Sequence, residues 1–240
     1  VRLDLDEAAA KKRARAIEEA GGQALVCRCN VLESGDIELA MQRVIETWGQ
    51  VDVLINGAGG NHPSGSTDES FATPELVGKA DAGGSRTPGP GDGSAGANKS
   101  PGAASGPAGA SASAAGGQAT FFDLPTSGFE RVFDLNFLGT VLPSRIIGRH
   151  MAERRDGVIL NMSSMSALTP LTKVGAYSAA KTAVASITRW LAVHLAPVGV
   201  RVNALAPGFF MTEQLKFLHI DQETGELTPR AKAVMAHTPM

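Results

Sequence analysis

Apolar residues recur along this chain with two spacings, which predict alternating strands and helices. Short apolar runs at residues 1–3, 24–29, 51–55, 158–161 and 200–205 are typical of buried strands. Helical spacing fills residues 6–20, 37–48 and 124–150, and an alanine-rich helix extends from Tyr177 to about residue 195. Strands and helices that alternate at this pitch predict an α/β fold with a doubly wound parallel sheet. The run at 51–55 is apolar except for Asp52, so we expect that strand to be covered on both faces.

Local signals place the ends and bends of these helices. Asp6 can cap the first helix, and Gly21-Gly22 can end it. Gly139 and Pro143 are candidate bends inside the long pattern at 124–150.

One tract departs from this pattern. From about residue 81 to 117 Gly, Ala, Ser and Pro dominate and large apolar residues are missing, which predicts a disordered insertion within one domain spanning 1–240. Gly91, Gly93 and Gly96 spell a dinucleotide-binding fingerprint there. The motif lacks the strand before it and the helix after it that the fingerprint needs, so we reject it.

Composition narrows the classes of function. The formal net charge is −2 without basic blocks, which argues against nucleic acid as a partner. The sequence has no run of eighteen apolar residues, so we expect no membrane span. It also has no charged and then apolar leader that resembles a signal peptide. Cys27 and Cys29 are the only cysteines, and we expect them to be reduced buried thiols of a cytoplasmic protein rather than a disulfide or a metal site.

The stretch with the clearest chemistry joins the strand at 158–161 to the next helix. Ser164 follows that strand, and Tyr177 and Lys181 lie one helical turn apart on one face. A hydroxyl, a phenol and an ammonium that face one crevice can move a proton. Taken alone, the Tyr-x-x-x-Lys spacing is equally typical of a buried aromatic beside a solvated lysine, and Ser163 competes for the serine role.

Further motifs in the same order make the chain resemble the short-chain dehydrogenase/reductase superfamily, which has a Rossmann-like fold. Asn56-Gly57-Ala58-Gly59 resembles the Asn-Asn-Ala-Gly signature of the superfamily, with Gly57 in place of the second Asn. Asn136 matches its mid-helix asparagine, and Pro207, Gly208 and Thr212 match its Pro-Gly segment. The alternatives are a generic turn at residue 56 and a buried asparagine that only ties backbone together at 136.

The resemblance implies a catalytic set of Asn136, Ser164, Tyr177 and Lys181. Tyr177 would be the acid/base, and Lys181 and the nicotinamide charge would lower its pKa from about 10. Ser164 would donate to the substrate oxygen, and Asn136 would hold a water in line with Lys181.

The expected cofactor is NAD. Asp4 at the end of the first strand would bind the ribose hydroxyls and repel a 2′-phosphate, and Leu5 follows it where an NADP enzyme could place an Arg. The alternative for Asp4 is a surface residue near a helix start. Asn30 and Val31 align with a pair that contacts adenine. The full set of expected cofactor-binding residues is Asp4, Asn30, Val31, Asn56, Gly57, Ala58, Gly59, Tyr177, Lys181, Pro207, Gly208 and Thr212.

Two parts of the superfamily pattern are missing from these residues, the first strand with its glycine loop and the last strand. We therefore expect a fragment of a longer chain that is inactive on its own, because the glycine loop holds the pyrophosphate.

The loops most resemble the D-mannonate oxidoreductase (fructuronate reductase) subgroup, which implies a sugar-acid substrate. Candidate substrate residues are Asn61, His62, Ser164 and Lys173, although the three other than Ser164 are equally typical of solvated loops. A reductase of 3-oxoacyl thioesters and a non-catalytic dinucleotide-binding fragment are the alternatives. The resemblance also implies a homo-tetramer.

Overall fold

The computed structural model describes residues 1–77, 119–210, 216–221 and 223–237. The strands are β1 (Arg2–Asp4), β2 (Val26–Arg28), β3 (Val53–Asn56), β4 (Gly157–Met162) and β5 (Val200–Leu205). The α-helices are α1 (Glu7–Glu19), α2 (Ser34–Trp48), α3 (Pro74–Val77), α4 (Thr126–Phe133), α5 (Gly139–Arg154), α6 (Gly175–Leu195), α7 (Lys216–His219) and α8 (Pro229–His237). The predicted insertion at about 81–117 and Thr212 lie outside the described residues.

The strands confirm the predicted parallel α/β architecture, in two separate sheets. β1 pairs with β2, and β4 lies between β3 and β5, all in parallel. Ile159 in the middle of β4 stands opposite Leu54 on one side and Val202 on the other. All three side chains are buried and form the centre of the core.

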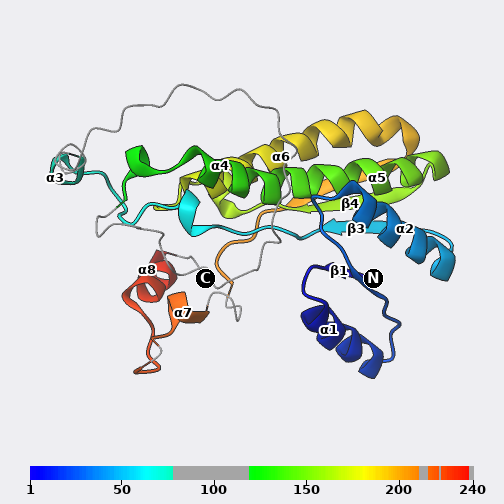
Figure 1. The fold of residues 1–240 in the computed structure, drawn as a ribbon, viewed down its shortest axis with the longest axis horizontal. Coiled ribbons are helices and arrows are strands. Elements are labelled where there is room, and N and C mark those ends of the chain that lie inside the picture. The colour runs from blue at the N-terminus through cyan, green and yellow to red at the C-terminus, as the bar shows by residue number, and fades with distance from the viewer. Residues whose placement is uncertain (78–118, 211–215, 222, 238–240) are drawn as a thin grey trace.

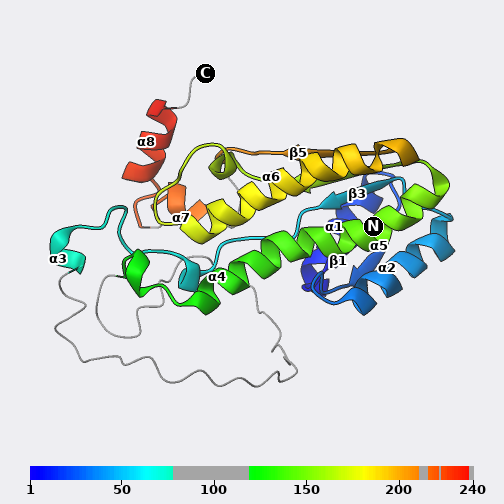
Figure 2. The ribbon, with the colours of Figure 1, turned by 90° about the horizontal axis from the view of Figure 1, so that it is seen from above.

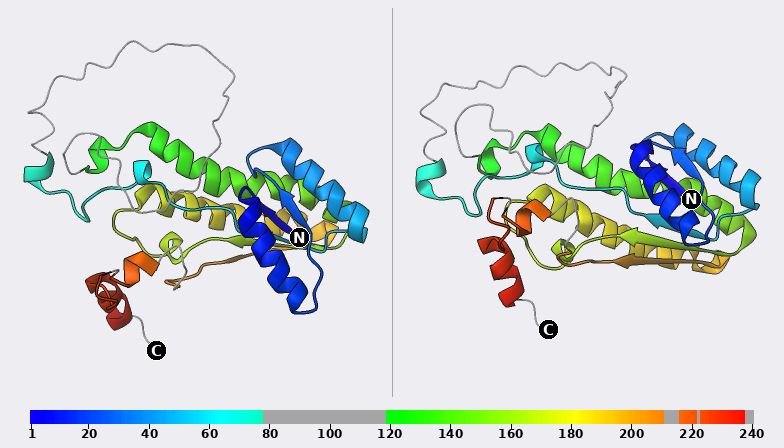
Figure 3. Two further views of the ribbon diagram at one scale, coloured as in Figure 1. Left: turned by 60° about the horizontal axis from the view of Figure 1, so that its bottom comes forward. Right: turned by 90° about the horizontal axis from the view of Figure 1, so that it is seen from below.

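Helices pack against each of the two sheets. α5 and α6 run along the three-stranded sheet with α2 beside α5, and α1 lies against β1 and β2 (Figures 1 and 2). Met151 of α5 and Ile37 of α2 are fully buried in the same core. α7 and α8 lie at the opposite end of the molecule from α2 (Figure 3).

The prediction that the strand at 51–55 is covered on both faces is wrong. Leu54 is buried, but Val53 and Ile55 on the other face of β3 are 54% and 60% exposed. Leu205 of β5 is 50% exposed. Since side chains alternate along a strand, one face of this sheet packs against α5 and α6 while, among the described residues, nothing covers the other.

The long pattern at 124–150 forms one helical run with a π-helical turn inside it. α4 leads into a π turn at Asp134–Leu138, and α5 follows directly from Gly139. Pro143 lies inside α5. Isolated π turns in α-helices occur frequently at functional sites, and this one contains Asn136.

A short turn after β3, η1 (Pro63–Gly65), is packed tightly against α4. A Cβ atom on Gly128 would overlap the Ser64 carbonyl, whereas one on Gly35 of α2 would meet nothing within 4 Å. Gly128 therefore sets how closely α4 approaches this turn.

We predict opposite effects of one substitution at these two glycines. Gly128→Ala should lower the free energy of unfolding by about 1–3 kcal/mol or more, because backbone must move to admit the methyl group. Gly35→Ala should leave stability unchanged or raise it by up to about 1 kcal/mol, because alanine favours a helix. Urea unfolding of both variants measures this, and equal effects would contradict the packing described.

Candidate functional site

Ser164, Tyr177 and Lys181 converge at the end of β4. The Ser164 hydroxyl lies close enough to the Tyr177 phenol to lower its pKa, although burial has the larger and opposite effect. The Lys181 ammonium nitrogen Nζ lies 5.6 Å from the centre of the Tyr177 ring. The three groups that the sequence separates by up to seventeen positions therefore face one another.

The local sequence explains this convergence. β4 ends at Met162, and Ser164 continues in extended conformation (φ −163°, ψ 155°) before the short turn η5 (Met165–Ala167). The Ser164 Oγ also accepts a hydrogen bond from the Ser166 amide (3.2 Å). α6 then begins at Gly175, so Tyr177 and Lys181 occupy successive turns at its amino end.

The two adjacent serines have different partners. Ser163 Oγ donates to the backbone carbonyl of Lys181 (3.0 Å), so this hydroxyl joins β4 to α6. Ser164 is the one that contacts the phenol. The geometry thus favours Ser164 for the catalytic role and gives Ser163 a structural one.

Asn136 fastens the loop after β3 to the long helix. Its side chain is fully buried, its Nδ2 donates to the Gly60 carbonyl (2.7 Å), and its Oδ1 accepts from the Gly60 amide (3.1 Å). A Cβ on Gly59 would lie 2.6 Å from Asn136 Oδ1 and 3.0 Å from Lys181 Nζ. Asn136 therefore belongs to the same cluster, where it holds backbone beside the lysine.

Burial, rather than attraction between charges, dominates the protonation of this cluster. Lys181 is 4% exposed, and burial lowers its pKa to about 8, while Nζ donates to the Met162 carbonyl (2.8 Å). Burial raises the pKa of Tyr177, and the Ser164 hydroxyl opposes this only in part. The expectation that Lys181 lowers the pKa of Tyr177 is therefore wrong for the protein without ligands, because the sequence does not show how much water both groups lose.

A buried polar chain beneath the cluster was missed by the sequence analysis. Asn56 Nδ2 donates to Ser144 Oγ (2.8 Å) and to Asn161 Oδ1 (2.8 Å), and Asn161 Nδ2 donates to Thr188 Oγ1 (2.9 Å). All four side chains are buried. The sequence signal that could have indicated this chain is the presence of these four polar residues inside otherwise apolar strand and helix patterns. Asn56 turns its side chain into this chain, so only its backbone neighbours Gly57, Ala58 and Gly59 remain to border a ligand.

The other expected cofactor residues lie at the carboxyl ends of strands, where ligands bind in open α/β sheets. The Asp4 carboxylate accepts from Arg2 (2.9 Å) and from the Asp6 amide (3.2 Å). Asn30 Oδ1 accepts from the Leu32 amide (3.1 Å), and Val31 packs against α5 at Gly139.

The segment after β5 also borders the cluster. The Pro207 carbonyl accepts from the Met165 amide (2.9 Å), and Gly208 lies beside the Met165 sulfur. This segment is thus held to the turn that follows Ser164.

The expected substrate residues lie on two loops beside the cluster. Asn61 Nδ2 donates to Ser66 Oγ (2.6 Å), while its Oδ1 is buried without a hydrogen-bond partner. Lys173 is exposed with a left-handed backbone (φ 69°), and its ammonium donates to the Asp68 carbonyl. His62 contacts Arg131, a residue that the sequence analysis did not single out.

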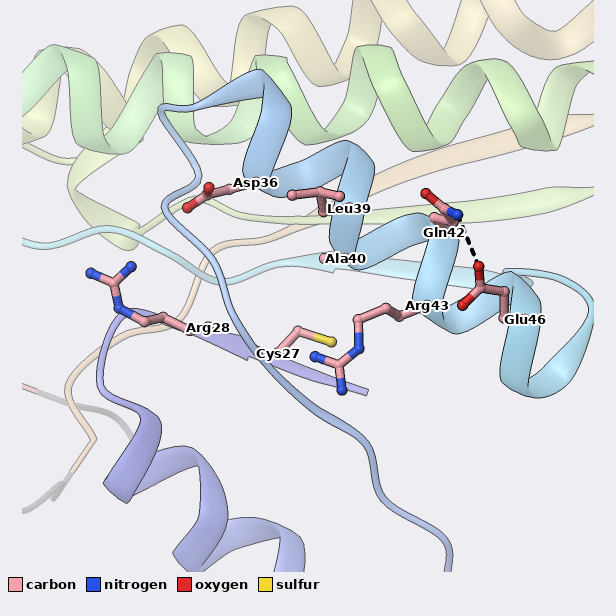
Figure 4. A pocket seen from close by; sticks show the side chains of 8 residues that line it. All are labelled: Cys27, Arg28, Asp36, Leu39, Ala40, Gln42, Arg43 and Glu46. Carbon is pink, nitrogen blue, oxygen red and sulfur yellow. Dashed lines mark hydrogen bonds between the residues drawn. The ribbon is translucent and has the colours of Figure 1, made fainter.

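The hollow of about 350 Å³ in Figure 4 shares no residue with this cluster. It lies between β2 and α2 and is lined by Cys27, Arg28, Asp36, Leu39, Ala40, Gln42, Arg43 and Glu46. Cys27 and Cys29 are both free thiols and buried, and burial, followed by Asp36 and Cys27, raises the pKa of Cys29 to about 11. The Cys29 thiol is therefore a poor nucleophile.

Two further findings concern the described part of the chain. No three His, Cys, Asp or Glu side chains there come together as metal ligands. No helix there has the length and apolar character needed to cross a membrane.

The sequence matches the family model for short chain dehydrogenases over residues 1–75 and 108–223. It is 38% identical over 238 residues to an uncharacterized oxidoreductase of Haemophilus influenzae, which covers 99% of this chain and 70% of that protein. It is also 38% identical over 225 residues to UxuB of Bacillus subtilis, an uncharacterized oxidoreductase, covering 93% of this chain and 66% of that protein. The chain thus spans roughly two thirds of the length of these relatives.

A solved structure shares the fold at the same identity. It is that of a candidate D-mannonate oxidoreductase from Haemophilus with bound NAD, with a TM-score of 0.76, 38% identity, and coverage of 99% of this chain and 71% of that one.

The burial of Lys181 predicts an unusual pH dependence of stability. Its pKa is about 8 in the folded protein against 10.5 normally, so between these values the unfolded chain holds a proton that the folded chain has lost. The contribution of Lys181 to folding stability should therefore rise with pH across this window, by up to about 3 kcal/mol.

Urea unfolding of wild type and Lys181→Met between pH 7.5 and 10 tests this. The titration of Tyr177 and Cys29 contributes to both proteins and therefore cancels in the difference between their free energies of unfolding. Wild type should gain stability relative to the variant as the pH rises. A constant difference would show that the lysine titrates normally in the fold.

Proposed function

The chain belongs to the short-chain dehydrogenase family, and on that premise we propose that it is an NAD-dependent oxidoreductase that interconverts a secondary alcohol and a ketone on a sugar acid. The observation that carries this proposal is the convergence of Ser164, Tyr177 and the buried Lys181, whose Nζ lies 5.6 Å from the centre of the Tyr177 ring. Lys181 is buried and forms no ion pair with a carboxylate among the residues that the structure describes, and such a lysine suits a site where charge develops during a reaction.

The proposed proton transfer takes place at Tyr177. The nicotinamide, when bound, would exchange a hydride with the carbon that carries the oxygen. In ketone reduction the Tyr177 phenol donates its proton to that oxygen, and in alcohol oxidation the phenolate accepts it. Ser164 would donate a hydrogen bond to the same oxygen as charge develops on it. The raised pKa of Tyr177 suits the donor in the reductive direction, because the phenol stays protonated at neutral pH.

The residues present fit NAD as the cofactor. A Cβ on Gly57 or Gly60 would meet nothing within 4 Å, so a ligand could approach the backbone of this loop closely. Asp4 would exchange its exposed ion pair with Arg2 for the ribose hydroxyls, and it would repel a 2′-phosphate. Lys181 would hold the other ribose. Asn30, Val31, Pro207, Gly208 and Thr212 complete the proposed cofactor set.

The sugar-acid substrate is supported by the Haemophilus structure described as a candidate D-mannonate oxidoreductase. Asn61 and Lys173 supply hydrogen-bonding groups on the loops next to the cluster, as a polyhydroxylated acid requires, and His62 contacts Arg131. D-mannonate and D-fructuronate are the proposed pair. A 3-oxoacyl thioester reductase would be expected to prefer NADPH, which Asp4 disfavours.

Assembly and location belong to the same proposal. Trp190 and Val193 on α6 are 56% and 78% exposed, which supports contact between copies through this helix and a homo-tetramer. We place the protein in the cytoplasm, in keeping with its two free thiols.

The proposed reaction predicts that the full-length protein, rather than residues 1–240 alone, reduces D-fructuronate with NADH in preference to NADPH, and that Tyr177→Phe abolishes this. Turnover should fall by about 10²–10⁴-fold, because the variant has no proton to donate. Its affinity for NADH, measured by fluorescence titration, should remain. Reduction of an acetoacetyl thioester instead would favour the alternative reductase, and NADH binding by an inactive wild type would favour the non-catalytic alternative.

The adjacent serines provide a matched pair of variants. Ser164→Ala should lower kcat by about 10²–10³-fold, because it removes a donor to the reacting oxygen. Ser163→Ala should keep kcat within a few-fold and lower the free energy of unfolding by about 1 kcal/mol, because it removes one buried hydrogen bond. Steady-state kinetics and urea unfolding of both separate the two roles, and the reverse result would exchange them.

A further inference from the structure

Arg131 and His62 meet beside the candidate site. The guanidinium Nη1 of Arg131, on α4, lies 3.0 Å from Nε2 of His62, on the loop after β3. A guanidinium carries only donors, so His62 Nε2 must accept this hydrogen bond. The ring proton then resides on Nδ1, which lies 2.8 Å from Ser64 Oγ and can donate to it. Burial, followed by the charge of Arg131, lowers the pKa of His62, in keeping with a neutral ring.

The ring thus fixes one edge of the guanidinium. One N–H of Arg131 is used by His62, and no other hydrogen bond or ion pair forms to the guanidinium in the part of the chain that the structure describes. The remaining N–H groups of the fork are available, and Arg131 is exposed. A planar fork with free donors matches a carboxylate, which can accept two parallel hydrogen bonds from it.

The loop that carries His62 is anchored to the catalytic cluster. Its Gly60 is bonded at both backbone groups to Asn136, and Gly59 borders Lys181 Nζ. A Cβ on Gly65, a few residues on, would meet Val132 of α4 and Ala176, the residue before Tyr177. His62 follows Gly59 by three residues, so their Cα atoms are at most about 11 Å apart. A small sugar acid can span from the cluster to this loop.

Charge supports the same assignment. Lys173 on the neighbouring loop is tied to the Asp68 carbonyl and, like Arg131, forms no ion pair with a carboxylate among the described residues. Helix α4 and the loop before α6 therefore each carry a cation without an ion pair among the described residues, which favours an anionic ligand.

We propose that Arg131 binds the carboxylate of the sugar-acid substrate and that His62 positions its guanidinium. This inference rests on the proposed function, and it assigns substrate selection to a residue outside the Ser-Tyr-Lys cluster. The hydroxyl or keto group that reacts lies several bonds from the carboxylate, so Arg131 determines which carbon reaches Tyr177.

Four forms of the full-length protein test the proposal: wild type, Arg131→Gln, Arg131→Lys and Arg149→Gln. Arg149 is also exposed and lies on the same helical run, roughly 27 Å further along, so its variant controls for loss of charge alone. Arg131→Gln should raise the KM for D-fructuronate about 10–100-fold with kcat within a few-fold and NADH affinity unchanged. Arg131→Lys should recover only part of this, because an ammonium keeps the charge but not the fork. Arg149→Gln should match wild type.

Two results would overturn the inference. One is an Arg131→Gln variant whose KM is unchanged, whether or not its kcat falls, and the other is an equal rise of KM in Arg149→Gln. Failure of the proposed function looks different, because wild type itself would then not reduce D-fructuronate. In that case calorimetric titration with D-mannonate decides the matter, since Arg131 should bind it in wild type and not in Arg131→Gln, and absence of binding by wild type would also refute the role.

Discussion

The buried pair of amides, Asn56 and Asn161, is the contact on which the site depends. It joins β3 to β4, and Asn161 continues to Thr188 on α6 while Asn56 continues to Ser144 on α5. A buried amide without partners costs several kcal/mol, so this set of bonds is satisfied only when both strands and both helices are in register. Ser164 leaves β4 three residues after Asn161, and Tyr177 and Lys181 stand on the α6 helix that carries Thr188. The register of the polar chain is therefore also the register of the catalytic groups.

The same packing explains the electrostatics of the site. The Lys181 ammonium donates to the Met162 carbonyl, and the Lys181 backbone carbonyl accepts a hydrogen bond from Ser163. Gly59 lies next to the ammonium. These contacts remove water from the lysine and partly from Tyr177, which shifts the pKa of each toward its neutral form. Because neither group forms an ion pair with a carboxylate in the described ranges, the charge of a bound cofactor or substrate would have a large effect on both.

Much of the fold could be predicted because its signals are local. Asp6 caps α1 as expected, with its side chain accepting from the Ala9 amide, and Tyr177 and Lys181 share a helical face because of their spacing. What the sequence did not reveal depends on residues far apart in it. Examples are the Asn56–Asn161 bond, the His62–Arg131 contact and the uncovered face at Val53 and Ile55. The pKa of Tyr177 belongs with them, because desolvation depends on how completely distant segments enclose the phenol.

The charged residues around the cluster suggest a direction along the site. Asp4, on the β1–β2 side, has an exposed ion pair with Arg2, and such pairs contribute about 0–1 kcal/mol, so its carboxylate can be given to another partner at little cost. Arg131 on α4 and Lys173 on the loop before α6 have no acidic partner in the described chain. A negative group therefore stands at one side of the catalytic cluster and positive groups at another. A cofactor with neutral ribose hydroxyls toward Asp4 and a substrate with its carboxylate toward Arg131 fit this arrangement. The opposite orientation would bring the carboxylate of the substrate toward the carboxylate of Asp4.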